Sequence, residues 1–90
     1  MSRKYARRDQ NISALRNIWC LKGMAAMVRT LHTMSDASIR EIAIALDLEP
    51  TRIAVANHID VVMTRQRAMY EQSKAHALDE FAKHLEASND

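Results

Sequence analysis

Glycine and proline are almost absent from this chain, and that limits what the chain can fold into. Gly23 is the single glycine and Pro50 the single proline among 90 residues. A β-sheet protein normally uses several of each in its hairpin turns. Apolar residues make up 48% of the chain but aromatic residues only 4%, so the core must consist mainly of aliphatic side chains and methionine. These features predict one small all-α domain with a core of modest size.

The first part of the chain is expected to be a basic arm followed by a helix. Residues 1–9 hold too few apolar groups to pack, which predicts a flexible arm. Its four basic residues are Arg3, Lys4, Arg7 and Arg8. Residues 10–90 are expected to form a single helical domain. Apolar residues recur at steps of three and four over 11–32, which predicts its first helix. We expect Gly23 to lie inside that helix, where another backbone crosses closely, because a helical glycine is otherwise costly.

A second, shorter helix is expected in the middle of the chain. Ser38 and Glu41 fit the S-x-x-E capping box, in which each side chain accepts a hydrogen bond from the backbone N–H of the other residue. A helix is therefore predicted over 39–47. Asp47 stands where a left-handed residue is expected to end it, and aspartate tolerates that conformation better than most residues.

A long helix is expected at the C-terminal side of the chain. Pro50 suits the first position of a helix, so the connection before it should span about three residues. The absence of Gly and Pro after Pro50 predicts a helix over 50–88, either unbroken or bent near Ser73. Its apolar stripe is too long for one small bundle to cover, which predicts a homodimer or larger homo-oligomer. The residues assigned to that interface are Ile59, Val62, Met63, Met69, Tyr70, Phe81 and Leu85.

Six apolar positions in the middle of the chain have the spacing of a helix-turn-helix. Counted from Ile39, places 4, 5, 8, 10, 15 and 18 hold Ile42, Ala43, Leu46, Leu48, Ile53 and Ala56. The fifth place must be small because two helices cross there, and Ala43 meets that demand. The segment 38–59, SIREIAIALDLEPTRIAVANHI, resembles the tri-helical helix-turn-helix of bacterial and phage transcription regulators, as found in sigma-factor, LuxR-type and MarR-type domains. The resemblance implies a central helix-turn-helix, no β wing, and a DNA-binding regulator of transcription.

A DNA-binding function assigns two groups of residues to the nucleic acid. The second helix of a helix-turn-helix enters the major groove by its N-terminal end. This end is poor in side chains that read bases with two hydrogen bonds, so affinity is expected mainly from phosphate contacts. The residues assigned to DNA are Arg3, Lys4, Arg7, Arg8, Thr51, Arg52, Val55, Asn57, His58 and Arg65.

A protein-binding function is the alternative left open by the sequence. Residues 36–50 carry a net charge of −3, which suits a polyanion poorly. An apolar residue such as Val55 on the outer face would serve a protein partner. The chain would then be a helical module such as a phage-encoded inhibitor or adaptor of a host protein.

The sequence contains no pattern of an enzyme. The four histidines are not spaced to bind one metal from one helix, Cys20 has no second cysteine, and no glycine-rich loop could hold a phosphate. We therefore expect no catalytic residues, no metal and no cofactor. No apolar run is long enough for a membrane span, the N-terminus lacks a signal peptide, and the lone cysteine is typical of a reducing compartment. A cytoplasmic location without membrane contact is predicted.

Overall fold

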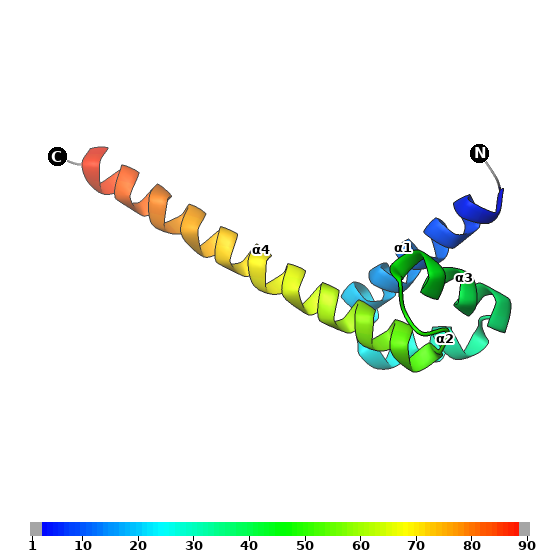
Figure 1. Ribbon diagram of the computed structural model, residues 1–90. Coiled ribbons are helices and arrows are strands. Elements are labelled where there is room, and N and C mark those ends of the chain that lie inside the picture. Colours follow the sequence, from blue (N-terminus) through cyan, green and yellow to red (C-terminus); the bar gives the residue numbers. More distant parts are fainter. Residues whose placement is uncertain (1–2, 89–90) are drawn as a thin grey trace.

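The fold consists of helices alone over the residues that the structure describes. The computed structural model describes the backbone of residues 3–88 and the side chains of residues 7–88. Four helices form in chain order (Figure 1): α1 (Arg3–Lys22), α2 (Met24–Thr33), α3 (Asp36–Leu46) and α4 (Arg52–Ser88). No strand occurs between residues 3 and 88. The predicted all-α domain with a long C-terminal helix and no β wing is therefore confirmed.

The hydrophobic core lies at one end of the molecule. Helix α1 packs against the other three helices, and α4 packs against α2 and α3. The buried side chains are Ile12, Leu15, Trp19, Met27, Leu31, Ile39, Ile42, Ala43, Val55, Ala56, Ile59 and Met63. Met63 is the last of them, so the rest of α4 leaves the core. Figure 1 shows this part of α4 running alone away from the other helices.

The predicted helix over 11–32 is in fact two helices separated at Gly23. The backbone of Gly23 has φ 94°, and its N–H donates to the carbonyl oxygens of Ile18 and Trp19 at 3.2 and 3.1 Å. Glycine adopts a positive φ without the steric cost that a Cβ would add. The prediction of a close backbone crossing at Gly23 is wrong. Apart from Gly23 and its two chain neighbours, no heavy atom lies within 4 Å of a Cβ built on this residue. Gly23 therefore ends α1 and allows α2 to pack against α1.

The predicted flexible arm over 1–9 is also wrong for residues 3–9. These residues form the first turns of α1. Arginine, lysine and alanine are good helix formers, and no Gly or Pro separates them from the apolar pattern that follows, so the helix extends toward the N-terminus. Met1 and Ser2 lie outside the described residues.

Helix α3 begins three residues earlier than predicted. Its N-cap is Ser35, whose hydroxyl oxygen accepts a hydrogen bond from the Ser38 N–H at 3.1 Å. Ser38 is therefore inside the helix, and the predicted capping box with Glu41 does not start it. The C-terminal prediction is confirmed, because Asp47 adopts the left-handed conformation with φ 56° and ψ 52°.

The connection to α4 is longer than predicted. Thr51 caps α4 by accepting a hydrogen bond from the Ala54 N–H at 3.1 Å, so the helix begins at Arg52 and not at Pro50. Five residues, 47–51, thus separate α3 from α4. From Arg52, the helix continues to Ser88 without the alternative bend near Ser73.

Trp19 joins α1 to α4 at the edge of the core. Its indole N–H donates to a carboxylate oxygen of Asp60 at 2.9 Å. The guanidinium carbon of Arg67 lies 4.4 Å from the centroid of a Trp19 ring, a cation–π distance. The two contacts position the C-terminal part of α1 on α4 just before α4 leaves the core.

The Asp60→Ala variant is expected to lose about 1 kcal/mol of unfolding free energy, because the part-buried indole N–H of Trp19 would lose its hydrogen bond to the carboxylate. Urea denaturation followed by the fluorescence of Trp19, the only tryptophan, measures this loss directly. Asp60→Asn keeps an acceptor oxygen and should lose less than half as much. Equal stability of wild type and Asp60→Ala would show that this hydrogen bond has no net stabilising effect.

Candidate binding face at the start of α4

The register of α4 on the core differs from the predicted register. Ile53, assigned to the helix-turn-helix core, is 74% exposed, whereas Val55, assigned to DNA, is fully buried at 0% exposure. Helix α4 starts at Arg52, and its core residues are Val55, Ala56, Ile59 and Met63. Both assignments are therefore corrected.

The other core assignments agree with the structure. Ile42 and Ala43 are fully buried and Ala56 is buried. Leu46 and Leu48 are partly buried and pack against the core. Ala43 also accepts a backbone hydrogen bond from the Leu48 N–H at 2.8 Å, which closes the turn after α3. The contact between α3 and α4 is thus built from the predicted small and aliphatic residues.

Arg52 is committed to interactions within the chain. Its Nε donates to the carbonyl oxygen of Leu31 at 2.9 Å, and one Nη donates to the carbonyl oxygen of Met34. The other Nη lies 2.9 Å from Asp36 Oδ1. These three bonds join the start of α4 to the end of α2 and the start of α3. The assignment of Arg52 to phosphate contacts does not fit this geometry.

The remaining residues assigned to DNA are spread over the molecule. Thr51 uses its hydroxyl to cap α4. Asn57 is exposed and His58 is half-buried near the start of α4, whereas Arg65 is exposed on the part of α4 beyond the core. Arg7 is exposed on α1, and Arg8 forms an ion pair with Asp9 at 3.3 Å. For Arg3 and Lys4 the structure describes only the helical backbone.

Two adjoining hollows flank Ile53 on the surface. The larger, of about 600 Å³, is lined by His32, Asp36, Ile39, Arg40, Pro50, Thr51, Arg52 and Ile53. The smaller, of about 210 Å³, is lined by Met24, Val28, Leu31, His32, Arg52, Ile53, Ala56 and Asn57. His32, Arg52 and Ile53 line both hollows, so the two adjoin at these residues. We call the pair of adjoining hollows the Ile53 groove.

Sequence reasoning missed most of the Ile53 groove. Met24 and Val28 on α2, His32 at its end and Arg40 on α3 were not assigned to any binding site. One signal was present in the sequence: Ile53 and Val61 are eight residues apart, and both are exposed on α4. Two exposed aliphatic residues at that spacing share a helix face, which indicates an apolar surface.

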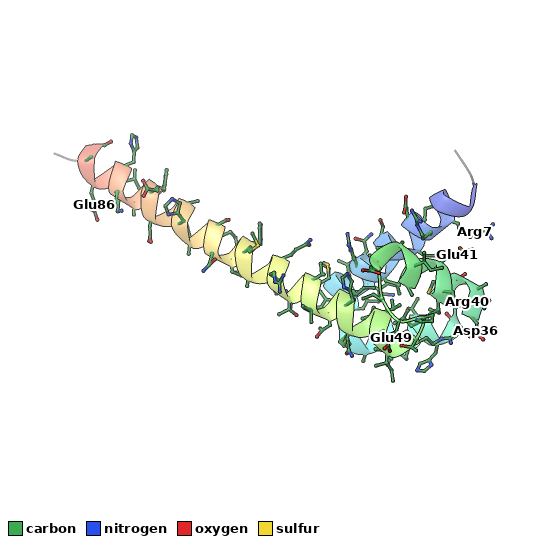
Figure 2. The ribbon with its side chains drawn as sticks, viewed as in Figure 1. Arg7, Asp36, Arg40, Glu41, Glu49 and Glu86 are labelled. Atoms are coloured by element: carbon green, nitrogen blue, oxygen red, sulfur yellow. The ribbon has the colours of Figure 1, made fainter. Side chains whose placement is uncertain are left out.

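Charged residues of both signs lie around the groove: Asp36, Arg40 and Arg52 line it, and Glu41 and Glu49 are sequence neighbours of lining residues. Figure 2 shows Asp36, Arg40, Glu41 and Glu49 gathered at the globular end, with Arg7 on the first turns of α1. Residues 36–50 hold four carboxylates and one arginine, and the Arg52 charge that faces them is paired with Asp36. The surface before α4 is therefore acidic, in contrast to the first turns of α1.

The residues assigned to the oligomer interface divide into three groups by exposure. Ile59 and Met63 are buried inside the chain, so their assignment is wrong: they belong to the core that α4 forms with the other helices. Val62 is half-buried. Met69, Tyr70, Phe81 and Leu85 are exposed on α4 beyond the core.

Comparisons of the chain with protein-family models, with curated proteins and with solved structures find no match. Within residues 3–88, no helix combines the length and apolar character needed to cross a membrane. The lone cysteine, Cys20, is exposed on α1. The binding face must therefore be interpreted from its own chemistry.

Proposed function

We propose that this chain is a protein-binding helical module whose Ile53 groove holds an amphipathic segment of a partner protein. The observation that carries the proposal is Ile53 itself. A large aliphatic side chain at 74% exposure stands between two hollows that are lined largely by apolar groups. Apolar helices commonly dock in such grooves through a few anchoring side chains.

The side chains at the start of α4 favour a protein over a nucleic acid. A DNA-reading helix presents arginine, asparagine or glutamine to base edges and lysine or arginine to phosphates. Here the exposed face presents Ile53, Asn57 and Val61. The Arg52 guanidinium already donates to the carbonyl oxygens of Leu31 and Met34. Glu49, just before the helix, would repel a phosphate.

The lining of the groove defines the chemistry of the partner. Asp36, Arg40 and Arg52 give the larger hollow charges of both signs, which favours a partner with polar groups of both signs at the rim. The apolar lining of the smaller hollow, which includes Met24, Val28 and Ile53, favours aliphatic or aromatic anchors. An amphipathic helix supplies both. In the bacterial or phage setting implied by the helix-turn-helix resemblance, this partner is a cytoplasmic host protein.

DNA binding is the second candidate, favoured by the basic start of α1. Four basic residues, Arg3, Lys4, Arg7 and Arg8, occupy two turns of one helix with Asp9 as the nearest acid. Such a cluster contributes phosphate contacts and therefore a steep salt dependence. In this version the regulator draws its affinity from α1 and the phosphates and little from the start of α4.

Site-specific photo-crosslinking tests the proposal. A photoreactive amino acid placed at position 53 should form one discrete adduct with a cellular protein, whereas the same probe at position 21 should not. Leu21 is a suitable control because it is 83% exposed on α1, away from the groove. The crosslinked protein is then purified, and its affinity is measured for wild type, Ile53→Asp and Leu21→Asp.

We expect Ile53→Asp to weaken that affinity by about a hundredfold, the effect of losing a central anchor, and Leu21→Asp to leave it unchanged. Equal adducts at both positions, or equal affinities of the two variants, would contradict the proposal. The second candidate would be favoured if the chain binds a DNA duplex at about 50 mM salt. That binding should weaken steeply as salt is added and should not change in Ile53→Asp.

A further inference from the structure

The second half of α4 has one apolar side, and it extends away from the core after Arg67, which lies against Trp19. Residues 64–88 are all exposed. At 100° per residue, five apolar residues fall within a sector of about 100° that also contains the buried Met63. They form what we call the α4 stripe: Tyr70, Ala77, Leu78, Phe81 and Leu85. The stripe thus continues the core face of α4 into solvent.

An uncovered helix of this kind is unfavourable in water. Most helical stability in proteins comes from packing of an apolar face, and isolated helices are marginal. Tyr70, Leu78 and Phe81 are 63%, 68% and 60% exposed, so most of their surface faces solvent. The α4 stripe therefore requires a covering surface of matching length.

The charges of α4 change sign along its exposed part. Residues 64–74 carry Arg65, Arg67 and Lys74 against Glu71, a net charge of +2. Residues 75–88 carry Asp79, Glu80 and Glu86 against Lys83, a net charge of −2. In a parallel, in-register pair the basic residues 64–74 would face the same basic residues of the second copy. In an antiparallel pair centred between Ala77 and Leu78 they face residues 81–88, where Lys83 and Glu86 cancel, so the antiparallel orientation has less repulsion between these segments.

The position of Lys74 also favours the antiparallel orientation. It lies within the α4 stripe, with its ammonium 4.9 Å from the centroid of the Tyr70 ring. In a parallel, in-register pair the two Lys74 ammonium groups would face each other in the interface. In an antiparallel pair centred between Ala77 and Leu78, Lys74 lies level with Phe81 of the second copy, where an aromatic ring favours a cation.

A hollow at the base of the stripe is positioned to receive the far end of such a helix. It has a volume of about 360 Å³ and is lined by Trp19, Cys20, Met63, Gln66, Arg67, Tyr70 and Glu71. In the antiparallel register, Leu85 of the second copy is level with Tyr70. Its last turn, residues 85–88, is then level with residues 67–70, of which Arg67 and Tyr70 line this hollow.

We infer that the α4 stripe is covered by the α4 stripe of a second copy of this chain, in antiparallel orientation about a two-fold axis between Ala77 and Leu78. The small Ala77 near the axis allows the two helices to approach closely. This inference does not rest on the function proposed for the Ile53 groove, which lies at the start of α4.

A matched pair of substitutions tests whether the stripe forms the interface. Phe81 and Met69 are both 60% exposed, but Met69 lies about 120° around the helix from Phe81 and outside the stripe. Phe81→Asp should raise the dimer dissociation constant by about a hundredfold or more, since the two-fold axis doubles its effect. Met69→Asp should change it less than about threefold. Sedimentation measures both, and unchanged Trp19 fluorescence shows that each variant is folded.

Single cysteines in a Cys20→Ser background test the orientation. The Ala77→Cys variant places two thiols beside the two-fold axis, so a disulfide-linked dimer should form under mild oxidation. The Ser88→Cys thiols would lie about 30 Å apart in the antiparallel pair, far beyond the roughly 7 Å that a disulfide allows between Cα atoms. Crosslinking at 88, or a monomer at about 100 µM that resists crosslinking at 77, would overturn the inference.

Discussion

The Val55→Asp variant is expected to be unfolded, whereas Ile53→Asp, two residues away, is expected to keep the native fold. Val55 is fully buried among the core residues of α4 and its neighbours, and a carboxylate there would have no polar partner. Burying an unpaired charged group costs more than about 4 kcal/mol, a large share of the 5–15 kcal/mol that stabilises a typical domain. Ile53 faces solvent, so aspartate is accommodated there.

Circular dichroism and Trp19 fluorescence at 25 °C distinguish the two variants. Val55→Asp should lose the cooperative thermal transition, and Ile53→Asp should melt within a few degrees of wild type. Val55→Ala is the milder control and should remain folded with reduced stability. If Val55→Asp folds and Ile53→Asp does not, the helix register predicted from the sequence is correct and the register described here is wrong.

Replacing Arg52 with methionine is expected to destabilise the fold by about 2–3 kcal/mol, because two carbonyl oxygens at the end of α2 lose a charged donor. Methionine keeps much of the side-chain volume, so the loss reports on the hydrogen bonds to Leu31 and Met34. For a domain of this size the melting temperature should fall by about 10 °C. Lysine cannot reproduce the planar arrangement of donors, so Arg52→Lys should recover little of the loss.

The ion pair between Arg52 and Asp36 contributes much less. Asp36 is 85% exposed at its side chain, and exposed pairs contribute below about 1 kcal/mol. Asp36→Asn is therefore the matched control, with a small effect that decreases further as salt increases. An Arg52→Met variant as stable as Asp36→Asn would mean that Arg52 does not lock α2 to α4.

Periodicity predicted the helices well because apolar spacing directly encodes which face is buried. It identified the long α4, the small Ala43 between α3 and α4, and the left-handed Asp47. It could not place Gly23, since a glycine inside a helical pattern is compatible with either a continuous helix or a break. The positive φ that decides between them depends on how α2 packs against α1.

The candidate site was harder to predict because its register depends on the length of a turn. A capping threonine after Pro50 added two residues to the expected connection. Ile53 and Val55 lie about 200° apart around a helix, so only one of them can be buried, whereas Ala56 lies about 60° from Ile53 and about 100° from Val55 and is buried in either register. The groove also draws on His32 and Arg40 from other helices, and a pattern read along one helix cannot detect such a combination.

Because α4 is unbroken from Arg52 to Ser88, it fixes the distance between the Ile53 groove and the proposed two-fold axis. From Ile53 to the axis between Ala77 and Leu78, the helix rises about 37 Å at 1.5 Å per residue. In an antiparallel pair, the two Ile53 grooves are therefore about 70 Å apart along the shared rod. A partner assembly that repeats its binding segment at that spacing gains avidity from both grooves, and one with closer sites engages only one at a time.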